Sequence, residues 1–237
     1  MGTGTSIAAV VLAAGESSRM GSPKQVLDWD GVPLVRHMVN TFAMGGACEV
    51  VVVVGCRARL VAGAALAFDD SAEVELPAVG DAHGVPLRVV ENVRWQLGMS
   101  SSAAVGARAC RPDAHGIMVC PVDLPLLAPY NIRRLIEGYE LLSRGAEGCL
   151  SAVASHNGKR GHPVIFSARQ RAALEALDSP QCVVNLKQLS ELGSVGRCYL
   201  VEAGSECVAS DIDTPDDYRR AVRALGSTYR GAGRDDD

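Results

Sequence analysis

The fold is decided by residues 10–24, which read Val10-Val11-Leu12-Ala13-Ala14-Gly15-Glu16-Ser17-Ser18-Arg19-Met20-Gly21-Ser22-Pro23-Lys24. The apolar run from Ile7 to Leu12 is typical of a buried strand. Small residues at the end of a strand let a ligand approach the backbone closely, and free N–H groups in such a loop bind anions. Arg19 adds a bidentate donor and Lys24 a point charge. The stretch therefore predicts a strand followed by a loop that holds a triphosphate.

Two other phosphate-binding motifs are absent from this stretch. It contains neither the P-loop pattern G-x-x-x-x-G-K-[ST] nor the dinucleotide-binding pattern G-x-G-x-x-G. The alternative to a phosphate loop is an ordinary strand-to-helix turn in which Arg19 and Lys24 are simply solvated.

The composition is that of a globular chain with an aliphatic core. Its 237 residues suffice for one large α/β domain or two small ones, and 48% of them are hydrophobic but only 4% aromatic. Few aromatic residues and a net charge of −4 without a basic run argue against a nucleic-acid partner. The eight cysteines form no C-x-x-C pair, which favours a reducing cytoplasm over a zinc or redox site. No apolar run is long enough to span a bilayer, so no membrane partner is expected.

Patterns of apolar residues predict alternating strands and helices along the chain. Continuous apolar or β-branched runs predict strands at 7–12, 49–54, 88–92, 117–120, 150–153, 162–166 and 196–201. Helical spacing predicts helices at 34–44, 57–68, 129–143, 168–177 and 183–192, and a last one from Pro215. Residues 95–102 are expected to be a loop that leads into a further helix, which runs to about Cys110. Asp30-Gly31 predicts a hairpin within residues 25–34, and residues 69–86 are expected to form a surface connection.

This alternation predicts the α/β class, with a three-layer α/β/α, Rossmann-like arrangement around a mostly parallel, mixed sheet. A single domain is expected over residues 1–227, built from halves at about 6–120 and 121–227, with a disordered tail at 228–237. Ligands of such sheets bind at the carboxyl ends of the strands. The loops at 13–24, 55–56, 92–102 and 121–125 are therefore expected to share one edge.

Acidic residues at this edge are candidate metal ligands. Asp123 directly follows an apolar strand and is placed to hold Mg²⁺ beside a triphosphate; the alternative is a cap or a turn. Asp211 and Asp213 point to the same face if the preceding strand continues, so that two carboxylates share a metal, with Asp213 favoured as the second ligand. Asp213 can instead help to start the last helix, for which Thr214 is the expected cap and Asp217 the reach-back residue.

The motifs resemble one family. Residues 12–24 are similar to the signature L-A-A-G-x-S-x-R-M-G-x-P-K of the nucleotidyltransferases related to molybdenum cofactor synthesis. Further matching motifs follow in family order at 98–102, 121–125, 161–163 and 211–218, so that the resemblance covers about residues 6–225. The guanylyltransferase relatives typically carry L-A-G-G where this chain has L-A-A-G. The chain thus resembles most the molybdenum cofactor cytidylyltransferase group of the MobA-like nucleotidyltransferases.

The resemblance implies Mg²⁺-dependent transfer of CMP from CTP to the terminal phosphate of Mo-molybdopterin, with pyrophosphate as the leaving group. It makes residues 6–120 the nucleotide-binding half and residues 121–227 the acceptor-binding half, and it is compatible with transient docking to a molybdoenzyme or its chaperone. The implied catalytic residues are Lys24, Arg19 and Asp123, and the implied metal ligands are Asp123 and Asp213. The implied nucleotide-binding residues are Leu12, Ala13, Ala14, Gly15, Ser18, Arg19, Lys24, Ser101 and Ser102. The candidate acceptor-binding residues are His162 and Asn92.

Structural roles stay open for several of these residues. Ser101 and Ser102 lie at a helix N-terminus, where hydroxyls cap the helix or bind an anion. His162 either contacts and orients the acceptor's phosphate or is a packed, hydrogen-bonded histidine. Lys159 and Arg160 either offer positive charge to an anionic acceptor or are solvated.

Three other functions also remain open. One is a nucleotidyltransferase that acts on another phosphorylated acceptor, such as a sugar or polyol phosphate, or with another NTP. Another is a molybdopterin-binding chaperone for a molybdoenzyme, which a degenerate metal site would favour. A dehydrogenase is the third, and the missing dinucleotide fingerprint argues against it.

Overall fold

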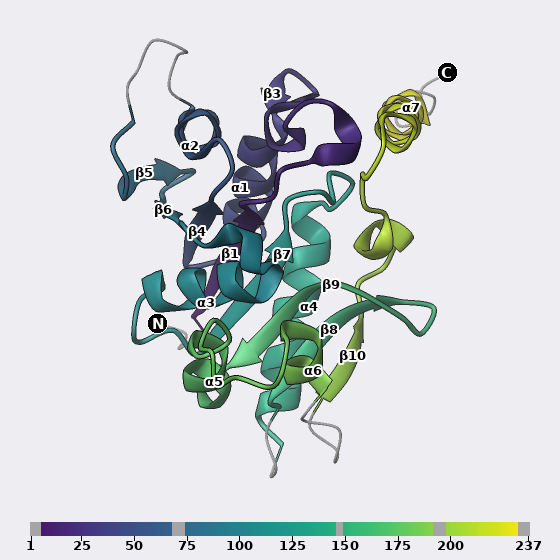
Figure 1. The fold of residues 1–237 in the computed structure, drawn as a ribbon. Helices are drawn as coiled ribbons and strands as arrows, with labels where there is room; N and C mark the ends of the chain where they lie inside the picture. Colours follow the sequence, from purple (N-terminus) through teal and green to yellow (C-terminus); the bar gives the residue numbers. More distant parts are fainter. Residues whose placement is uncertain (1–5, 68–73, 146–148, 192–197, 232–237) are drawn as a thin grey trace.

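Residues 7–13 form the strand that the sequence predicts, and this strand lies inside a sheet of eight strands (Figure 1). The computed structural model describes residues 6–67, 74–145, 149–191 and 198–231. The strands are β1 (Ile7–Ala13), β2 (Asp28–Trp29), β3 (Val32–Pro33), β4 (Glu49–Val54), β5 (Ala78–Ala82), β6 (Val85–Glu91), β7 (Gly116–Pro121), β8 (Ser151–His156), β9 (Lys159–Ser167) and β10 (Cys198–Glu202). The helices are α1 (Leu34–Met44), α2 (Ala58–Leu66), α3 (Met99–Ala109), α4 (Pro129–Ser143), α5 (Arg171–Glu175), α6 (Leu186–Glu191) and α7 (Pro215–Gly231). Short 3₁₀ helices are η1 (Ser18–Met20), η2 (Lys24–Val26), η3 (Trp95–Leu97), η4 (Ala168–Gln170) and η5 (Glu206–Ala209).

The sheet is mixed and mostly parallel, as predicted. Its strand order is β10-β8-β9-β7-β1-β4-β6-β5, and the strands β7, β1, β4 and β6 run parallel to one another. β10 is parallel to β8, whereas β9 is antiparallel to both β7 and β8, and β5 is antiparallel to β6. β1 and β4 are buried along their whole length, as expected for strands that helices cover on both faces.

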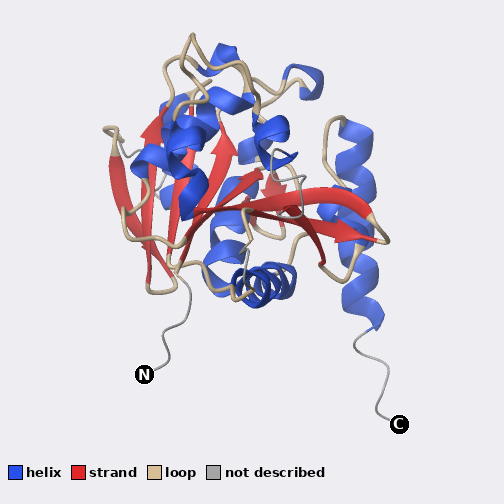
Figure 2. Ribbon diagram, turned by 90° about the horizontal axis from the view of Figure 1, so that it is seen from below, coloured by secondary structure: helices blue, strands red, loops and turns tan. Residues whose placement is uncertain are grey.

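Helices cover both faces of the sheet (Figure 2). α1, α2 and α4 pack with one core cluster, and α3, α5 and α6 pack with the other. Successive side chains of β1 alternate between the two clusters, because neighbouring residues of a strand point to opposite faces: Ile7, Ala9 and Val11 enter the first, and Ala8 and Val10 the second. The predicted three-layer, Rossmann-like α/β class is thereby confirmed.

The carboxyl ends of the parallel strands meet at one edge of the sheet. Backbone hydrogen bonds continue the pairing beyond the strands: the Cys56 N–H donates to the Ala14 carbonyl (3.0 Å) and the Val122 N–H to the Leu12 carbonyl (3.1 Å). The loop after β6 is tied to the end of β4 in the same way. The loops after β1, β4, β6 and β7 therefore share this edge, as predicted.

The segment at 69–86 differs from its prediction as a mere surface connection. Residues 78–82 form β5, which pairs antiparallel with β6 from Ala78 opposite Val89 to Ala82 opposite Val85. β5 contains Gly80 and Asp81 and is largely exposed, so it lacks the apolar run by which a buried strand is recognised. Residues 68–73 lie outside the described residues.

The second half contains longer strands and shorter helices than predicted. The polar turn expected at 156–161 is only the tip of the β8–β9 hairpin, where Asn157 and Gly158 have φ of 49° and 75°. The helix expected at 168–177 is divided into η4 and α5, and the one expected at 183–192 is reduced to α6. The strand expected at 196–201 is β10; residues 192–197 lie outside the described residues. No strand leads to Asp211, because residues 210–214 are irregular.

The last helix starts with the predicted capping box. The Asp217 N–H donates to Thr214 Oγ1 (3.3 Å), and the Thr214 N–H donates to the Asp217 carboxylate (2.7 Å). The Tyr218 hydroxyl donates to the Asp28 carbonyl (2.5 Å), and its ring meets Trp29 edge-on, so that α7 is tied to the β2–β3 hairpin. α7 continues to Gly231, past the predicted start of the tail at 228, and residues 232–237 lie outside the described residues.

In the part of the chain that the structure describes, none of the helices has both the length and the apolar character needed to span a bilayer.

Candidate functional site

A buried glutamine fixes the course of the loop after β1. Gln25 is 1% exposed and donates through Nε2 to the carbonyls of Ala13 (3.1 Å) and Gly15 (2.7 Å). Ser17, whose φ is 60°, donates through Oγ to Gln25 Oε1 (3.3 Å) and accepts the Lys24 N–H (3.1 Å). A Cβ placed on Gly15 would meet no atom within 4 Å. The loop is thus braced from within and open on its outer side.

The Lys24 ammonium lies between two carboxylates from the second half of the chain. Its Nζ donates to the carboxylate of Asp123, in the loop after β7, and lies 3.5 Å from Oδ1 of Asp213, just before α7. The Ile212 carbonyl is a further acceptor at 3.4 Å. The side chains of Lys24 and Asp123 are only 15% and 16% exposed. Three acceptors therefore surround an ammonium that has three donors to give.

The Asp213 carboxylate is free to face these cations because Thr214 and Asp217 form the capping box of the last helix. Asp217 accepts the N–H groups of both Asp213 (3.2 Å) and Thr214 (2.7 Å). Asp213 Oδ1 instead pairs with Nη2 of Arg19 (3.0 Å), a side chain that is 67% exposed. Solvent screens such a pair, so it contributes little to stability. The arrangement leaves Asp213 beside Lys24 rather than at the helix terminus.

A cavity of about 530 Å³ opens beside this cluster and includes Asp123 in its lining. Its floor is the sheet, where alternate residues of β9 lie against Val119 and Pro121 of β7. These β9 residues are Arg160, His162, Val164 and Phe166. α6 contributes Leu186, Lys187 and Ser190 to the lining. Apolar residues thus form most of the walls, with basic side chains among them.

His162 and Asp211 both line this cavity. Burial lowers the pKa of His162, and the charges of Asp123 and Asp211 oppose this shift, so that the imidazole is neutral at neutral pH. Its Nδ1 is buried and has no hydrogen-bond partner among the described residues. Asp211 does not share the position of Asp213, since no strand holds the two in register; only Asp213 is ion-paired with Lys24.

Three predicted ligand residues form a separate, buried cluster. The amide of Asn92 donates through Nδ2 to the hydroxyls of Ser101 (2.8 Å) and Ser102 (3.1 Å). All three side chains are less than 5% exposed. Ser101 also donates to the Gly98 carbonyl (2.9 Å). These groups bond with one another in the structure and hold the loop after β6 against the start of α3.

The remaining predicted residues lie on the loop after β1. The side chains of Leu12, Ala13 and Ala14 are buried, so that only their backbone can face a ligand. Gly15 and Ser18 are exposed. The structure therefore brings this loop, Lys24, Arg19, Asp123 and Asp213 together and places His162 in the adjoining cavity. Asn92, Ser101 and Ser102 lie in the next loop of the same edge, where their side chains bind one another.

Comparison with known proteins agrees with this geometry. Residues 9–192 match the family model described as the MobA-like NTP transferase domain. The chain belongs to the MobA-like NTP transferase family. It is thus an enzyme of the nucleotidyltransferase kind, which confirms the resemblance seen in the sequence.

Named members of the MobA-like family differ in activity. The chain is 30% identical over 219 residues to nicotine blue oxidoreductase of Paenarthrobacter nicotinovorans, covering 91% of this chain and 96% of the relative. It is 24% identical over 218 residues to molybdenum cofactor cytidylyltransferase of Escherichia coli K12, covering 90% and 94%. The structure of a nucleotidyl transferase from Methanothermobacter superposes with a TM-score of 0.71 at 25% identity, covering 95% of this chain and all of that one.

MobA-like and related nucleotidyltransferases use divalent metals, and the donor set here fits such an ion. Asp123 and Asp213 supply hard carboxylate oxygens that already converge on one cation, the Lys24 ammonium. The described residues contain no group of three or more His, Cys, Asp or Glu side chains that could hold a metal. An ion held here would therefore complete its coordination with substrate phosphates and water, as Mg²⁺ commonly does.

Two residues of the MobA-like site were not recognised in the sequence. Gln25 braces the loop after β1, and its only sequence signal is its place directly after Lys24. His37 of α1 donates from Nε2 to the Pro125 carbonyl (2.9 Å) and thereby supports the loop that carries Asp123. No local pattern marks His37, because its partner is far away in the chain.

We expect His37 to make stability pH-dependent. Burial lowers the pKa of His37, although its bond to Pro125 and the charge of Asp30 oppose this shift. Below the unfolded pKa of about 6.5, the unfolded chain takes up a proton at His37 that the folded protein does not bind. The free energy of unfolding is therefore unaffected by His37 above pH 6.5 and decreases as the pH falls from 6.5 toward the folded-state pKa. The loss from this residue is at most about 1.4 kcal/mol per pH unit.

Urea denaturation between pH 7.5 and 5 measures this effect. The variant His37→Gln keeps a donor for the Pro125 carbonyl but does not titrate, and it should show a shallower fall in unfolding free energy. A fall as steep as that of the unmodified protein would assign the pH dependence to other groups.

Proposed function

We propose that the protein transfers CMP from CTP to the terminal phosphate of a molybdopterin-type acceptor in the cytoplasm, with Mg²⁺ as cofactor and pyrophosphate as product. The observation that carries the proposal is that Asp123 belongs both to the Lys24–Asp213 cluster and to the lining of the adjoining cavity. A nucleotide on the loop after β1 and an acceptor in the cavity would then meet at one carboxylate.

The loop after β1 is the proposed site of the triphosphate. Its outer side is open at Gly15, and Arg19 and Lys24 flank it with positive charge. An acceptor phosphate oxygen would attack the α-phosphorus in line, while the bond from that phosphorus to the bridging β-phosphate oxygen breaks. Such reactions depend mainly on positioning and on stabilisation of charge. Lys24 and Arg19 would stabilise the charge of the departing pyrophosphate.

Asp123 and Asp213 are the proposed ligands of the divalent ion. When bound, the ion would neutralise phosphate charge and polarise the α-phosphate. A crystal structure of Rv0371C from Mycobacterium tuberculosis in complex with manganese is 26% identical to this chain, with a TM-score of 0.63, and supports a divalent ion in this fold. Mg²⁺ is our choice because two carboxylates plus phosphates are its usual protein environment.

The chemistry of the cavity supports an acceptor that combines an apolar body with anionic groups. Met99 and Val164 contribute apolar surface to the lining, and Arg160 and Lys187 offer positive charge. The buried, unpartnered Nδ1 of His162 is an available group for an acceptor atom. A molybdopterin, with its ring system and terminal phosphate, matches this combination better than a small polyol phosphate.

Pyrophosphate release with each of the four NTPs and Mg²⁺, with and without Mo-molybdopterin, tests the proposal. We expect release with CTP that requires the pterin. Release with a different base would keep the reaction but overturn the choice of CTP. Pterin binding without release from any NTP would indicate a chaperone, and release that requires a sugar or polyol phosphate instead would identify another acceptor.

An oxidoreductase is the second candidate function. The observation that favours it is the 30% identity to nicotine blue oxidoreductase over 91% of this chain, higher than the 24% identity to the cytidylyltransferase. The corresponding assay follows the absorbance of nicotine blue in the presence of an electron donor. Conversion of nicotine blue without any nucleotidyl transfer would favour this second function over the first.

A further inference from the structure

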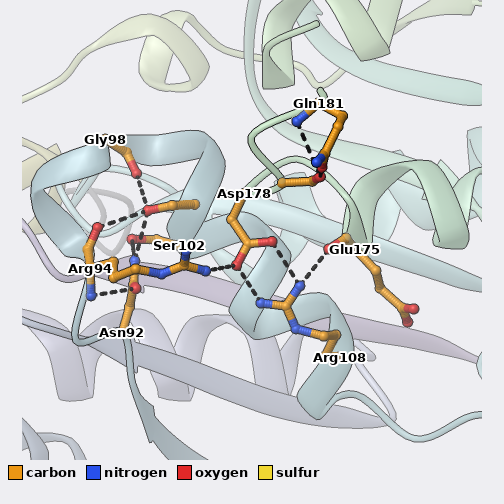
Figure 3. Close-up of polar contacts among 10 residues, drawn as sticks. Asn92, Arg94, Gly98, Ser102, Arg108, Glu175, Asp178 and Gln181 are labelled. Atoms are coloured by element: carbon orange, nitrogen blue, oxygen red, sulfur yellow. Dashed lines mark hydrogen bonds and ion pairs between the residues drawn. The ribbon is translucent and has the colours of Figure 1, made fainter. Parts of the chain in front are cut away.

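Asp178, in the connection after α5, binds two arginines from different elements (Figure 3). Its Oδ2 accepts from Nη2 of Arg94 (2.8 Å) and from Nη2 of Arg108 (2.7 Å), and its Oδ1 accepts from Nη1 of Arg108 (3.0 Å). Nη1 of Arg108 also donates to the Glu175 carbonyl (2.5 Å). The Asp178 side chain is only 9% exposed, although the arginines are 55% and 43% exposed. The carboxylate is therefore enclosed, and the guanidinium groups of Arg94 and Arg108 shield it from solvent.

Arg108 anchors Asp178 to a rigid part of the fold. Arg108 lies in the last turn of α3, and its bidentate contact with the carboxylate is of the strong, charge-assisted kind. Its hydrogen bonds are the main cause of the lowered pKa of Asp178, which is ionised at neutral pH. Asp178 thus presents a fixed negative charge to Arg94, which comes from the loop after β6.

Arg94 connects the fixed Asp178 carboxylate to the loop after β6, at the edge of the sheet. Its backbone N–H donates to Oδ1 of Asn92 (3.0 Å), the residue that also binds Ser101 and Ser102. Asn92 fixes the start of the loop at 92–98, and Asp178 fixes it from outside through the Arg94 side chain. Figure 3 shows this continuous line of contacts from Ser102 through Asn92 and Arg94 to Asp178.

The residue that follows Arg94 touches the phosphate loop region. A Cβ on Gly55 would lie 2.6 Å from Cβ and 2.8 Å from Cγ of Trp95, and 2.9 Å from Cβ of Ala14. Trp95, Gly55 and Ala14 therefore meet in one place, with the small residue at 55 making room for the indole. A shift of the loop at 92–98 would move Trp95 away from Ala14, whose backbone belongs to the proposed nucleotide site.

We propose that Asp178 is a positioning residue for the nucleotide: it holds Arg94 so that Trp95 packs against Gly55 and Ala14 and the nucleotide meets a preformed surface. The inference rests on the proposed function, because it assigns the loop after β1 to the NTP. Without Asp178 the nucleotide must order the loop on binding, which weakens affinity and leaves the chemical step intact.

The variant Asp178→Asn tests this role in the full-length protein. We expect the Kd of Mg–CTP, measured by calorimetry, and the KM for CTP to rise about tenfold, with kcat within twofold. Acrylamide should quench tryptophan fluorescence more strongly, and the change reports Trp95, because Trp29 is 1% exposed. Arg94→Gln should reproduce both effects, and its combination with Asp178→Asn should add nothing further. The matched control is Asp113→Asn, which also breaks an Arg–Asp pair, but an exposed one that follows the other end of α3.

Unchanged affinity and unchanged quenching in Asp178→Asn would overturn the inference, and so would an Arg94→Gln variant with normal affinity. A drop in kcat with a normal KM would also overturn it. If Asp178→Asn is poorly folded, the Arg94→Gln result alone decides. A parent protein that binds none of the four NTPs would refute the proposed function instead, and the quenching comparison would still show whether Asp178 holds the loop.

Discussion

Replacement of Asp123 by Asn should reduce nucleotidyl transfer by roughly 10³-fold, the scale of losing one preorganised charge at a reacting phosphate. The carboxylate serves both the Lys24–Asp213 cluster and the cavity, so its loss affects the proposed metal ion and the acceptor together. Asn keeps the shape and one acceptor oxygen, so the fold should survive. The measurement is pyrophosphate release under saturating NTP, together with Mn²⁺ affinity by electron paramagnetic resonance.

The control for this variant is Asp216→Asn, which removes an acid that is exposed on α7 and paired with Arg219 of the same helix. Asp216→Asn should match the parent protein in turnover and Mn²⁺ affinity. An Asp123→Asn variant that retains near-normal turnover would exclude Asp123 from the reaction.

Replacement of Lys24 by Gln should have two opposite effects. Transfer should fall by roughly 10²- to 10³-fold, because the triphosphate loses its buried counter-charge. In contrast, Mn²⁺ alone, without nucleotide, should bind about tenfold more tightly, because the ammonium that neutralises Asp123 and Asp213 competes with a cation for the same oxygens. In the parent protein, Lys24 would have to leave these acceptors before it could reach a phosphate.

The matched substitution Lys159→Gln removes the same charge from an exposed position at the tip of the β8–β9 hairpin. Lys159→Gln should keep the Mn²⁺ affinity within about twofold of that of the parent protein, because salt screens exposed surface charges. Mn²⁺ binding in Lys24→Gln that is no tighter than in Lys159→Gln would refute competition between the ammonium and the metal.

Most of the fold could be predicted because its central strands are locally recognisable. β1 and β4 are buried on both faces and are therefore continuous apolar runs, and α1 shows the spacing of a helix with one buried face. β5 could not be predicted in this way. It is an edge strand of small and polar residues, and it exists because β6 offers it a hydrogen-bonding partner.

The candidate site was predictable to the extent that its residues lie in compact motifs. Lys24 and Asp123 each follow a strand that ends at the ligand-binding edge, so topology alone brings them together. The prediction for Asp213 relied on a preceding strand, but residues 210–214 are irregular, and Asp213 is instead held by the bond from its N–H to the Asp217 carboxylate. Asp178 carries no sequence signal, because its role depends on two arginines that only the folded chain brings near.

The contact between Lys24 and the Ile212 carbonyl joins groups that are 188 positions apart in the chain. Contacts between residues so far apart in the chain form late in folding, because the entropy cost of closing a large loop comes before the contact can stabilise the chain. The pairing of β1 with β4 spans far fewer residues and closes a much smaller loop. During refolding from urea, sheet formation followed by circular dichroism should therefore precede the recovery of Mn²⁺ capture. Simultaneous recovery would mean that the chain acquires its sheet and its cation-binding pair in one cooperative step.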